Sequence, residues 1–193
     1  MQIDIEKTPN PATRKFLPGQ VVLPTGGRDF ASAEAAEASP LAAALFATGV
    51  VDGVYYGRDF VSVSVKNPAY WPELEADVVG LLLDHFVTGA PLFAGGDAAG
   101  IEVAPDPAPL SFEDDPADAD IIEQVKELLD TRVRPAVAAD GGDISYRGYR
   151  DGKLYLSMHG ACAGCPSSAV TLKRGVEGLI KHYVPEVETI EAV

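Results

Sequence analysis

Short runs in which apolar and polar residues alternate predict several β-strands in the first part of the chain. Residues 2–6, 15–17 and 20–23 are short apolar or alternating runs, and Pro or Gly residues separate them. Residues 50–56 and 60–65 alternate on either side of a Gly-Arg-Asp turn, which is the pattern of a β-hairpin. We therefore expect a short strand at each of these five positions.

Two segments of the same part of the chain have helical spacing instead. Residues 31–47 are rich in alanine, and Ser39 followed by proline suits the cap and first position of a new helix. A second helix is predicted to begin at Pro72 and to end near Gly89. Its apolar face consists of Leu74, Val78, Leu81, Leu82 and Phe86. Strands and helices together predict a mixed α/β domain over residues 1–93.

The last part of the chain, residues 120–193, shows the order helix, strand, strand, helix, strand. An amphipathic helix begins at Asp120, with a glutamate three positions later as in a capping box, and we expect it to end before Pro135. Alternating runs on either side of residues 150–152 predict a hairpin. Another helix begins at Pro166, and the final apolar run predicts a strand. The fold class is therefore α+β, with two small mixed α/β domains.

An acidic segment rich in Gly and Pro, residues 94–119, separates the two predicted domains. It contains no Lys or Arg, so nothing offsets its negative charges. These charges are Asp97, Glu102, Asp106, Glu113, Asp114, Asp115 and Asp118. Such a segment buries little apolar surface and its charges repel one another, which predicts an extended linker. An ordered surface loop within one larger domain is the alternative.

Composition excludes several classes of function. The 193 residues carry 15 Lys and Arg against 29 Asp and Glu, a formal net charge of −14. This balance argues against binding to nucleic acid or to an anionic membrane surface. No apolar run reaches the roughly 20 residues that span a bilayer, and the first residues resemble neither a signal peptide nor a transit peptide. We therefore expect a cytoplasmic protein.

The chain has two cysteines, and they form a Cys-x-x-Cys motif at Cys162 and Cys165. Small residues surround them, and the helix predicted at Pro166 follows directly. Unpaired N–H groups and the positive end of the dipole at a helix N-terminus favour a thiolate over a thiol. We therefore expect both sulfurs to be stabilised as thiolates. No other catalytic constellation is visible in the sequence, so we do not expect an enzyme.

Three kinds of chemistry suit this cysteine pair. A zinc site or an iron–sulfur cluster usually takes four ligands, and two copies of the motif across a symmetric dimer would supply four thiolates. His159, three residues before Cys162, is a further candidate ligand. A dithiol–disulfide oxidoreductase is the alternative use of the same pair, although no aromatic residue precedes Cys162 as in a thioredoxin.

The motifs together resemble one family. The Asp-Gly-Gly-Asp motif at residues 140–143, the following hairpin, and the Gly-Ala-Cys-Ala-Gly-Cys-Pro-Ser-Ser run at 160–168 closely resemble the C-terminal domain of NifU and Nfu proteins. The Thr-Pro-Asn-Pro motif at 8–11 and the hairpin residues 53–61 are similar to the Nfu N-terminal domain. The resemblance covers both predicted domains and omits the linker.

This resemblance implies an iron–sulfur cluster carrier. In the family, two C-terminal domains hold one [4Fe–4S] cluster between them through their Cys-x-x-Cys pairs and pass it to apo-proteins. The implied ligands are Cys162 and Cys165, and no other residue of this sequence takes that role. The implied partners are an upstream cluster-assembly scaffold, apo iron–sulfur proteins, and a second copy of the chain.

Overall fold

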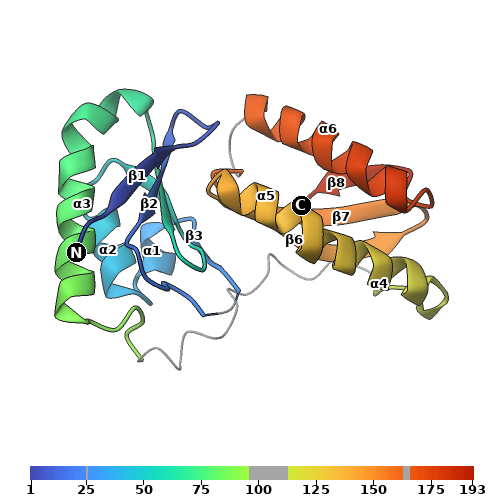
Figure 1. The fold of residues 1–193 in the computed structure, drawn as a ribbon, viewed down its shortest axis with the longest axis horizontal. Coiled ribbons are helices and arrows are strands. Elements are labelled where there is room, and N and C mark those ends of the chain that lie inside the picture. Colours follow the sequence, from blue (N-terminus) through green and yellow to red (C-terminus); the bar gives the residue numbers. More distant parts are fainter. Residues whose placement is uncertain (25, 96–112, 163–165) are drawn as a thin grey trace. The chain divides into compact units, whose positions relative to one another are not determined.

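The structure is a computed structural model that describes residues 1–24, 26–95, 113–162 and 166–193 (Figure 1). The chain divides into two compact units, Met1–Ala104 and Pro105–Val193. The predicted linker, residues 94–119, lies mostly outside the described residues. At its predicted end, Pro116–Asp118 form a 3-10 turn and Ala119 begins a helix of the second unit, so the linker ends before residue 116. Among the described residues, no helix combines the length and apolar character that crossing a membrane requires.

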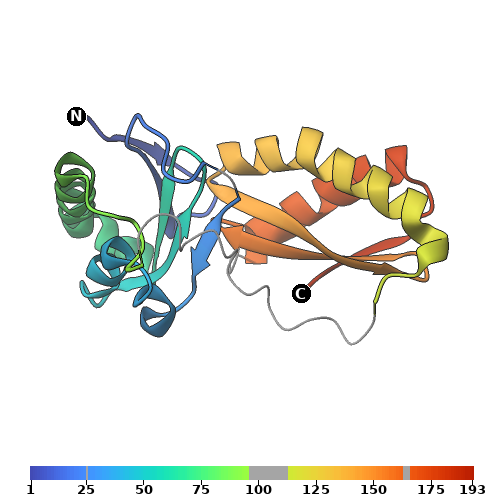
Figure 2. The same cartoon turned by 90° about the horizontal axis from the view of Figure 1, so that it is seen from below.

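The first unit is a five-stranded antiparallel sheet with its helices on one side (Figures 1 and 2). The strand order is β1-β2-β5-β4-β3. The strands are β1 (Asp4–Lys7), β2 (Thr13–Leu17), β3 (Arg28–Phe30), β4 (Val51–Tyr56) and β5 (Val61–Val65). The helices are α1 (Ala33–Ala36), α2 (Pro40–Phe46), the 3-10 turn η1 (Pro68–Tyr70) and α3 (Trp71–Thr88).

The core of this unit lies between the sheet and the helices. Strand alternation puts one set of side chains on the helix side, among them Phe16, Val54 and Val63, and each is at most 1% exposed. Helices α2 and α3 contribute Leu45 and Leu82 to the same core. The predicted hairpin is confirmed as β4 and β5, and the predicted helix end is confirmed at Gly89, which has a φ of 66°.

One predicted strand of this unit is wrong, and one strand was missed. Residues 20–23 form no strand: the N–H groups of Val22 and Leu23 both donate to the carbonyl oxygen of Arg58, at 2.7 and 3.2 Å. These side chains are apolar because they are buried in the core, not because they belong to a ladder. Strand β3 has three residues and one buried apolar side chain, too short for alternation to reveal.

Ser39 connects the cap of α2 to the sheet. Its hydroxyl oxygen accepts a hydrogen bond from the N–H of Ala42, which confirms the predicted cap, and it lies 2.8 Å from the Tyr56 hydroxyl. Both residues are fully buried. Burial raises the pKa of Tyr56 well above its ordinary value, although the Ser39 contact lowers it in part. The neutral phenol is therefore the form that the fold accommodates.

The stability of this unit is expected to fall in alkaline solution through Tyr56. The unfolded tyrosine loses its proton near pH 10 while the folded one keeps it, so the free energy of unfolding decreases above pH 10 by up to about 1.4 kcal/mol per pH unit. The buried Trp71 is the single tryptophan of the chain, so its fluorescence reports this unit alone. Tyr56→Phe should make the pH dependence shallower, and an unchanged slope would show that Tyr56 ionises freely.

The second unit is a three-stranded sheet packed against helices (Figures 1 and 2). Strand β7 lies in the centre, antiparallel to β6 and parallel to β8. Its elements are the 3-10 turn η3 (Pro116–Asp118), α4 (Ala119–Leu128), the π-helical turn η4 (Leu129–Val133), α5 (Arg134–Ala139), β6 (Gly142–Arg150), β7 (Lys153–Gly160), α6 (Pro166–Tyr183) and β8 (Thr189–Ala192). The predicted α-β-β-α-β order is confirmed.

The hairpin between β6 and β7 turns at Asp151 and Gly152, as predicted. Both residues have positive φ, 50° and 75°, as a two-residue turn with the twist of the strands requires. Ile144, Leu154 and Leu156 point to the helix side and are fully buried. The sheet is therefore anchored along its whole length to the core of this unit.

The predicted end of the first helix of this unit, before Pro135, is wrong. Helix α5 continues through Pro135 to Ala139, because the proline lies in the first turn of α5 directly after the wider π turn η4. Helix α4 begins at Ala119, one residue before the predicted start, and the predicted capping box is wrong, because Asp118 is at the cap position and Asp120 lies within the first turn. The 3-10 turn η3 precedes it, and the Asp115 side chain caps that turn by accepting from the N–H of Ala117 at 2.9 Å.

Candidate functional site

The described cysteine, Cys162, lies two residues after the end of β7. The N–H of Ala161 donates to the carbonyl oxygen of Gly141 at 3.1 Å, which holds the chain after β7 against the start of β6. The N–H of Cys162 donates to the carbonyl oxygen of His159 at 3.4 Å. Cys165 lies outside the described residues, and α6 begins directly after it, as predicted.

The side chain of Cys162 is buried in the core of the second unit, with 6% of its surface exposed. Its sulfur packs against Gly142, the first residue of β6. A Cβ atom at Gly142 would collide with the Cys162 sulfur and would lie 2.8 Å from the carbonyl oxygen of His159. The glycine therefore leaves the space that the sulfur fills.

The expectation of a thiolate is wrong for Cys162. Burial above all, together with the charges of Asp140 and Asp143, raises the pKa of the Cys162 thiol to about 12. The sequence-based expectation relied on the N-terminus of α6, but the sulfur lies in an apolar core near two carboxylates. At neutral pH Cys162 is a protonated thiol in this structure.

Asp143 forms an ion pair with Arg134 next to this cysteine. Nε and Nη2 of Arg134 donate to the two carboxylate oxygens of Asp143 at 2.9 and 2.8 Å. The N–H of Ile144 donates to the same carboxylate at 2.8 Å, and Arg134 also donates to Asp130 at 3.0 Å. These contacts raise the pKa of Arg134, above all through Asp143. The pair joins the start of α5 to the start of β6, beside Gly142.

His159 does not point toward Cys162. Its Nε2 atom lies 3.2 Å from the Ser145 hydroxyl on the neighbouring strand. Strand alternation puts His159 on the opposite face of the sheet from Leu156, which belongs to the same core as Cys162. Within the described ranges, no group of three or more His, Cys, Asp and Glu side chains is arranged to hold a metal ion. These residues of one chain therefore do not form a complete ligand set.

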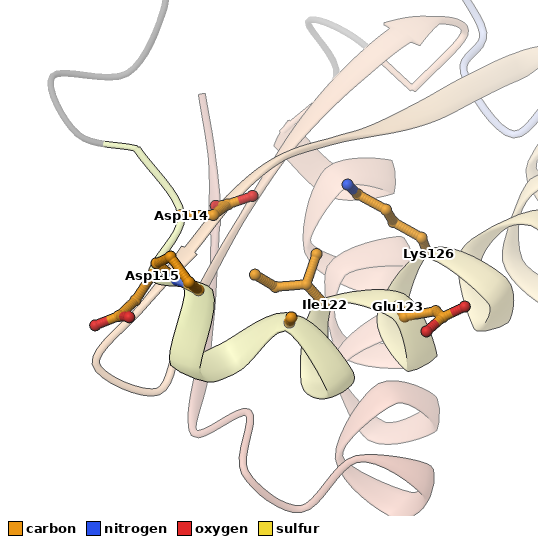
Figure 3. Close-up of a pocket in the computed structure, with 7 residues that line it drawn as sticks. Asp114, Asp115, Ile122, Glu123 and Lys126 are labelled. Atoms are coloured by element: carbon orange, nitrogen blue, oxygen red, sulfur yellow. The ribbon is translucent and has the colours of Figure 1, made fainter.

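A separate hollow of about 400 Å³ lies beside α4 (Figure 3). Ile122 lies between Asp114 and Lys126 in this hollow (Figure 3). Asp114 accepts a hydrogen bond from the N–H of Tyr149 at 3.0 Å, so the hollow is near the end of β6 opposite to Gly142. It contains no cysteine and is distinct from the cysteine site.

Comparison with known proteins matches both units of the chain to families. Residues 3–89 match the model described as scaffold protein Nfu/NifU N terminal, and residues 125–191 match the NifU-like domain. The human NFU1 iron-sulfur cluster scaffold homolog, mitochondrial, is 41% identical over 100% of this chain and 72% of its own. NifU-like protein 5, mitochondrial, from Arabidopsis thaliana is 43% identical over 99% of this chain and 67% of its own.

One solved structure with partial similarity is that of a NifU-like protein from Saccharomyces cerevisiae. It is 21% identical, with a TM-score of 0.43, over 49% of this chain and 85% of that chain. This similarity is too weak to support an inference about the present chain.

The expectation of a cytoplasmic protein is contradicted by these relatives. Both the human and the Arabidopsis proteins are named mitochondrial. The expectation was wrong because it relied on the lack of an apolar span and of a leader pattern. Neither feature records the compartment in which a folded domain works.

Proposed function

The chain belongs to the Nfu family of iron–sulfur cluster scaffold proteins, and we propose that it binds a [4Fe–4S] cluster between two subunits and transfers it to apo-proteins. The ligands are Cys162 and Cys165 of each subunit. The observation that carries this proposal is that both units of the chain match the family, with the Cys-x-x-Cys motif in the NifU-like part. The protein is a carrier, not an enzyme, and the cluster is its cargo.

Two chains are needed because one chain has two cysteines. A [4Fe–4S] cluster is usually held by four thiolates, so two copies of the motif across a symmetric interface complete the set. The described residues offer no other group of metal ligands, and His159 is directed to Ser145. The cluster-bound form is therefore a homodimer.

The state of Cys162 favours cluster binding over the alternative, a dithiol–disulfide oxidoreductase. An oxidoreductase needs an accessible thiolate to attack its substrate, whereas the Cys162 side chain is 6% exposed and lies in the core of the second unit. A coordinating metal removes the thiol proton itself, so cluster binding does not need a low pKa in the free protein. The buried thiol is thus compatible with a metal cargo and unfavourable for disulfide exchange.

Transfer follows from a cluster held by two short loops at a subunit interface. Such a cluster is more accessible to an incoming thiolate than one enclosed by four cysteines of a single chain, so ligands can exchange one at a time. The partners are an upstream scaffold that supplies the cluster and apo iron–sulfur proteins that receive it. The first unit, within residues 1–93, carries no cysteine and serves in partner recognition.

The test is an absorption spectrum and a metal assay on anaerobically reconstituted protein. The proposal predicts a brown protein with about four iron atoms per dimer. A colourless protein with zinc would indicate an interaction module with a zinc site at its dimer interface. A colourless protein without metal that reduces disulfides would indicate the oxidoreductase. Either of these two results contradicts the proposal.

A further inference from the structure

Cys162 cannot ligate a shared cluster from the position in which the structure places it. Its side chain is 6% exposed and belongs to the core of the second unit. A cluster held between two chains needs each sulfur at the surface of its own chain. The side chain must therefore leave the core before the sulfur can bind iron from a shared cluster.

The buried position depends on Gly142. The neighbouring Gly141 has a φ of 79° and needs to be glycine for its backbone conformation, whereas Gly142 lies in β6 and does not have a positive φ. The need for glycine at residue 142 comes from space, because a Cβ would collide with the sulfur of Cys162 and would lie 2.8 Å from the carbonyl oxygen of His159. The second glycine of the Asp-Gly-Gly-Asp motif thus provides the space in which the Cys162 thiol is buried.

Hydrogen bonds of the two neighbouring residues hold Gly142 in place. The carbonyl oxygen of Gly141 accepts from the N–H of Ala161, and Arg134 holds Asp143 on the other side of Gly142. The residues before and after Gly142 are therefore tied to the cysteine segment and to α5. The site does not widen easily, so a Cβ at residue 142 would displace the Cys162 sulfur and would also press on the backbone carbonyl of His159 at the end of β7.

We propose that Gly142 is a positioning residue. In the absence of a cluster it allows the Cys162 side chain to occupy a buried position, and cluster binding moves the thiol from the core to the surface. The inference rests on the proposed function only for the cluster-bound position. The buried position withholds one thiol of each pair from oxidants and from stray metal ions until a cluster arrives. On binding, the sulfur bonds to iron as a thiolate of the cluster donor leaves that iron, and the thiol proton passes to the departing thiolate.

The buried position is tested by thiol reactivity, without iron. In a Cys165→Ser chain, Cys162 is the one remaining thiol, and its addition to N-ethylmaleimide is followed by mass. The rate in the native chain should be at least about tenfold lower than after denaturation in guanidinium at the same pH. Equal rates in the native and the denatured chain would overturn the inference, independently of the results for the glycine variants.

Gly142→Ala in the same background should raise the native rate of Cys162 by about tenfold. The matched control is Gly175→Ala in α6, where a Cβ meets no atom within 4 Å, and it should leave the rate unchanged. Circular dichroism checks that both variants fold. An unchanged Cys162 rate in folded Gly142→Ala protein would contradict the role of Gly142.

Iron loading separates this inference from the proposed function. In a chain with both cysteines, Gly142→Ala should load iron about tenfold faster, because the thiol no longer has to leave the core. Loss of loading in this variant alone would mean that the buried position is itself the ligating one, which overturns the inference. Absence of iron in the unaltered chain would contradict the proposed function, while the reactivity of Cys162 would still report its buried position.

Discussion

Replacing Cys162 with alanine is expected to abolish cluster binding. Iron after anaerobic reconstitution should fall from about four atoms per dimer to nearly none, because two of the four thiolates of the shared site are lost. The iron-dependent dimer should then run as a monomer in size-exclusion chromatography. Cys165→Ala should have the same effect, since each position supplies two of the four ligands.

His159→Ala is the matched control for this prediction. His159 lies three residues from Cys162 in the sequence, but its ring contacts Ser145 on the neighbouring strand. Iron content should therefore be unchanged in this variant. Full iron binding in Cys162→Ala protein, or its loss in His159→Ala protein, would show that the ligand set is not the one proposed.

Replacing Arg134 with methionine is expected to destabilise the second unit by about 3 kcal/mol. Asp143 would lose both hydrogen bonds from the guanidinium, and it is 9% exposed. A buried carboxylate that loses the two hydrogen bonds of its cationic partner is costly to the folded state. The thermal midpoint of this unit should fall by more than about 10 °C.

Two internal controls accompany the Arg134 measurement. Circular dichroism reports both units, whereas Trp71 fluorescence reports the first unit alone and should be unchanged. Lys181→Met removes an ion pair of 2.6 Å with Glu177 on the surface of α6, and it should shift stability by no more than about 0.5 kcal/mol. Equal effects of the two substitutions would mean that the Arg134–Asp143 pair contributes no more than a surface contact.

Most helices and hairpins were predictable because their signals are local. Ser39 caps α2, Gly89 ends α3, and Asp151 and Gly152 form the tight turn of the β6–β7 hairpin. The errors occur where a long-range contact replaces a local one. Val22 and Leu23 are apolar because they pack in the core, and the helix containing Pro135 continues because the proline lies in the first turn of α5.

The residues of the candidate site were predictable from the sequence, but the burial of Cys162 was not. The sequence has two cysteines, so their spacing alone identifies them. The burial of Cys162 and its contact with Gly142 depend on the pairing of β6 with β7, which brings residues 142 and 160 together. The Arg134–Asp143 pair joins a helix to a strand across a turn, and the Asp-Gly-Gly-Asp motif was its only visible signal.

The mass of the cluster-loaded protein under native conditions tests the central claim most directly. Native mass spectrometry of anaerobically reconstituted protein should show two chains plus the mass of one [4Fe–4S] cluster, and the dimer should disappear when iron is removed. A single chain carrying one metal ion, or a dimer without iron and sulfide, would contradict the proposal that two chains share one cluster through Cys162 and Cys165.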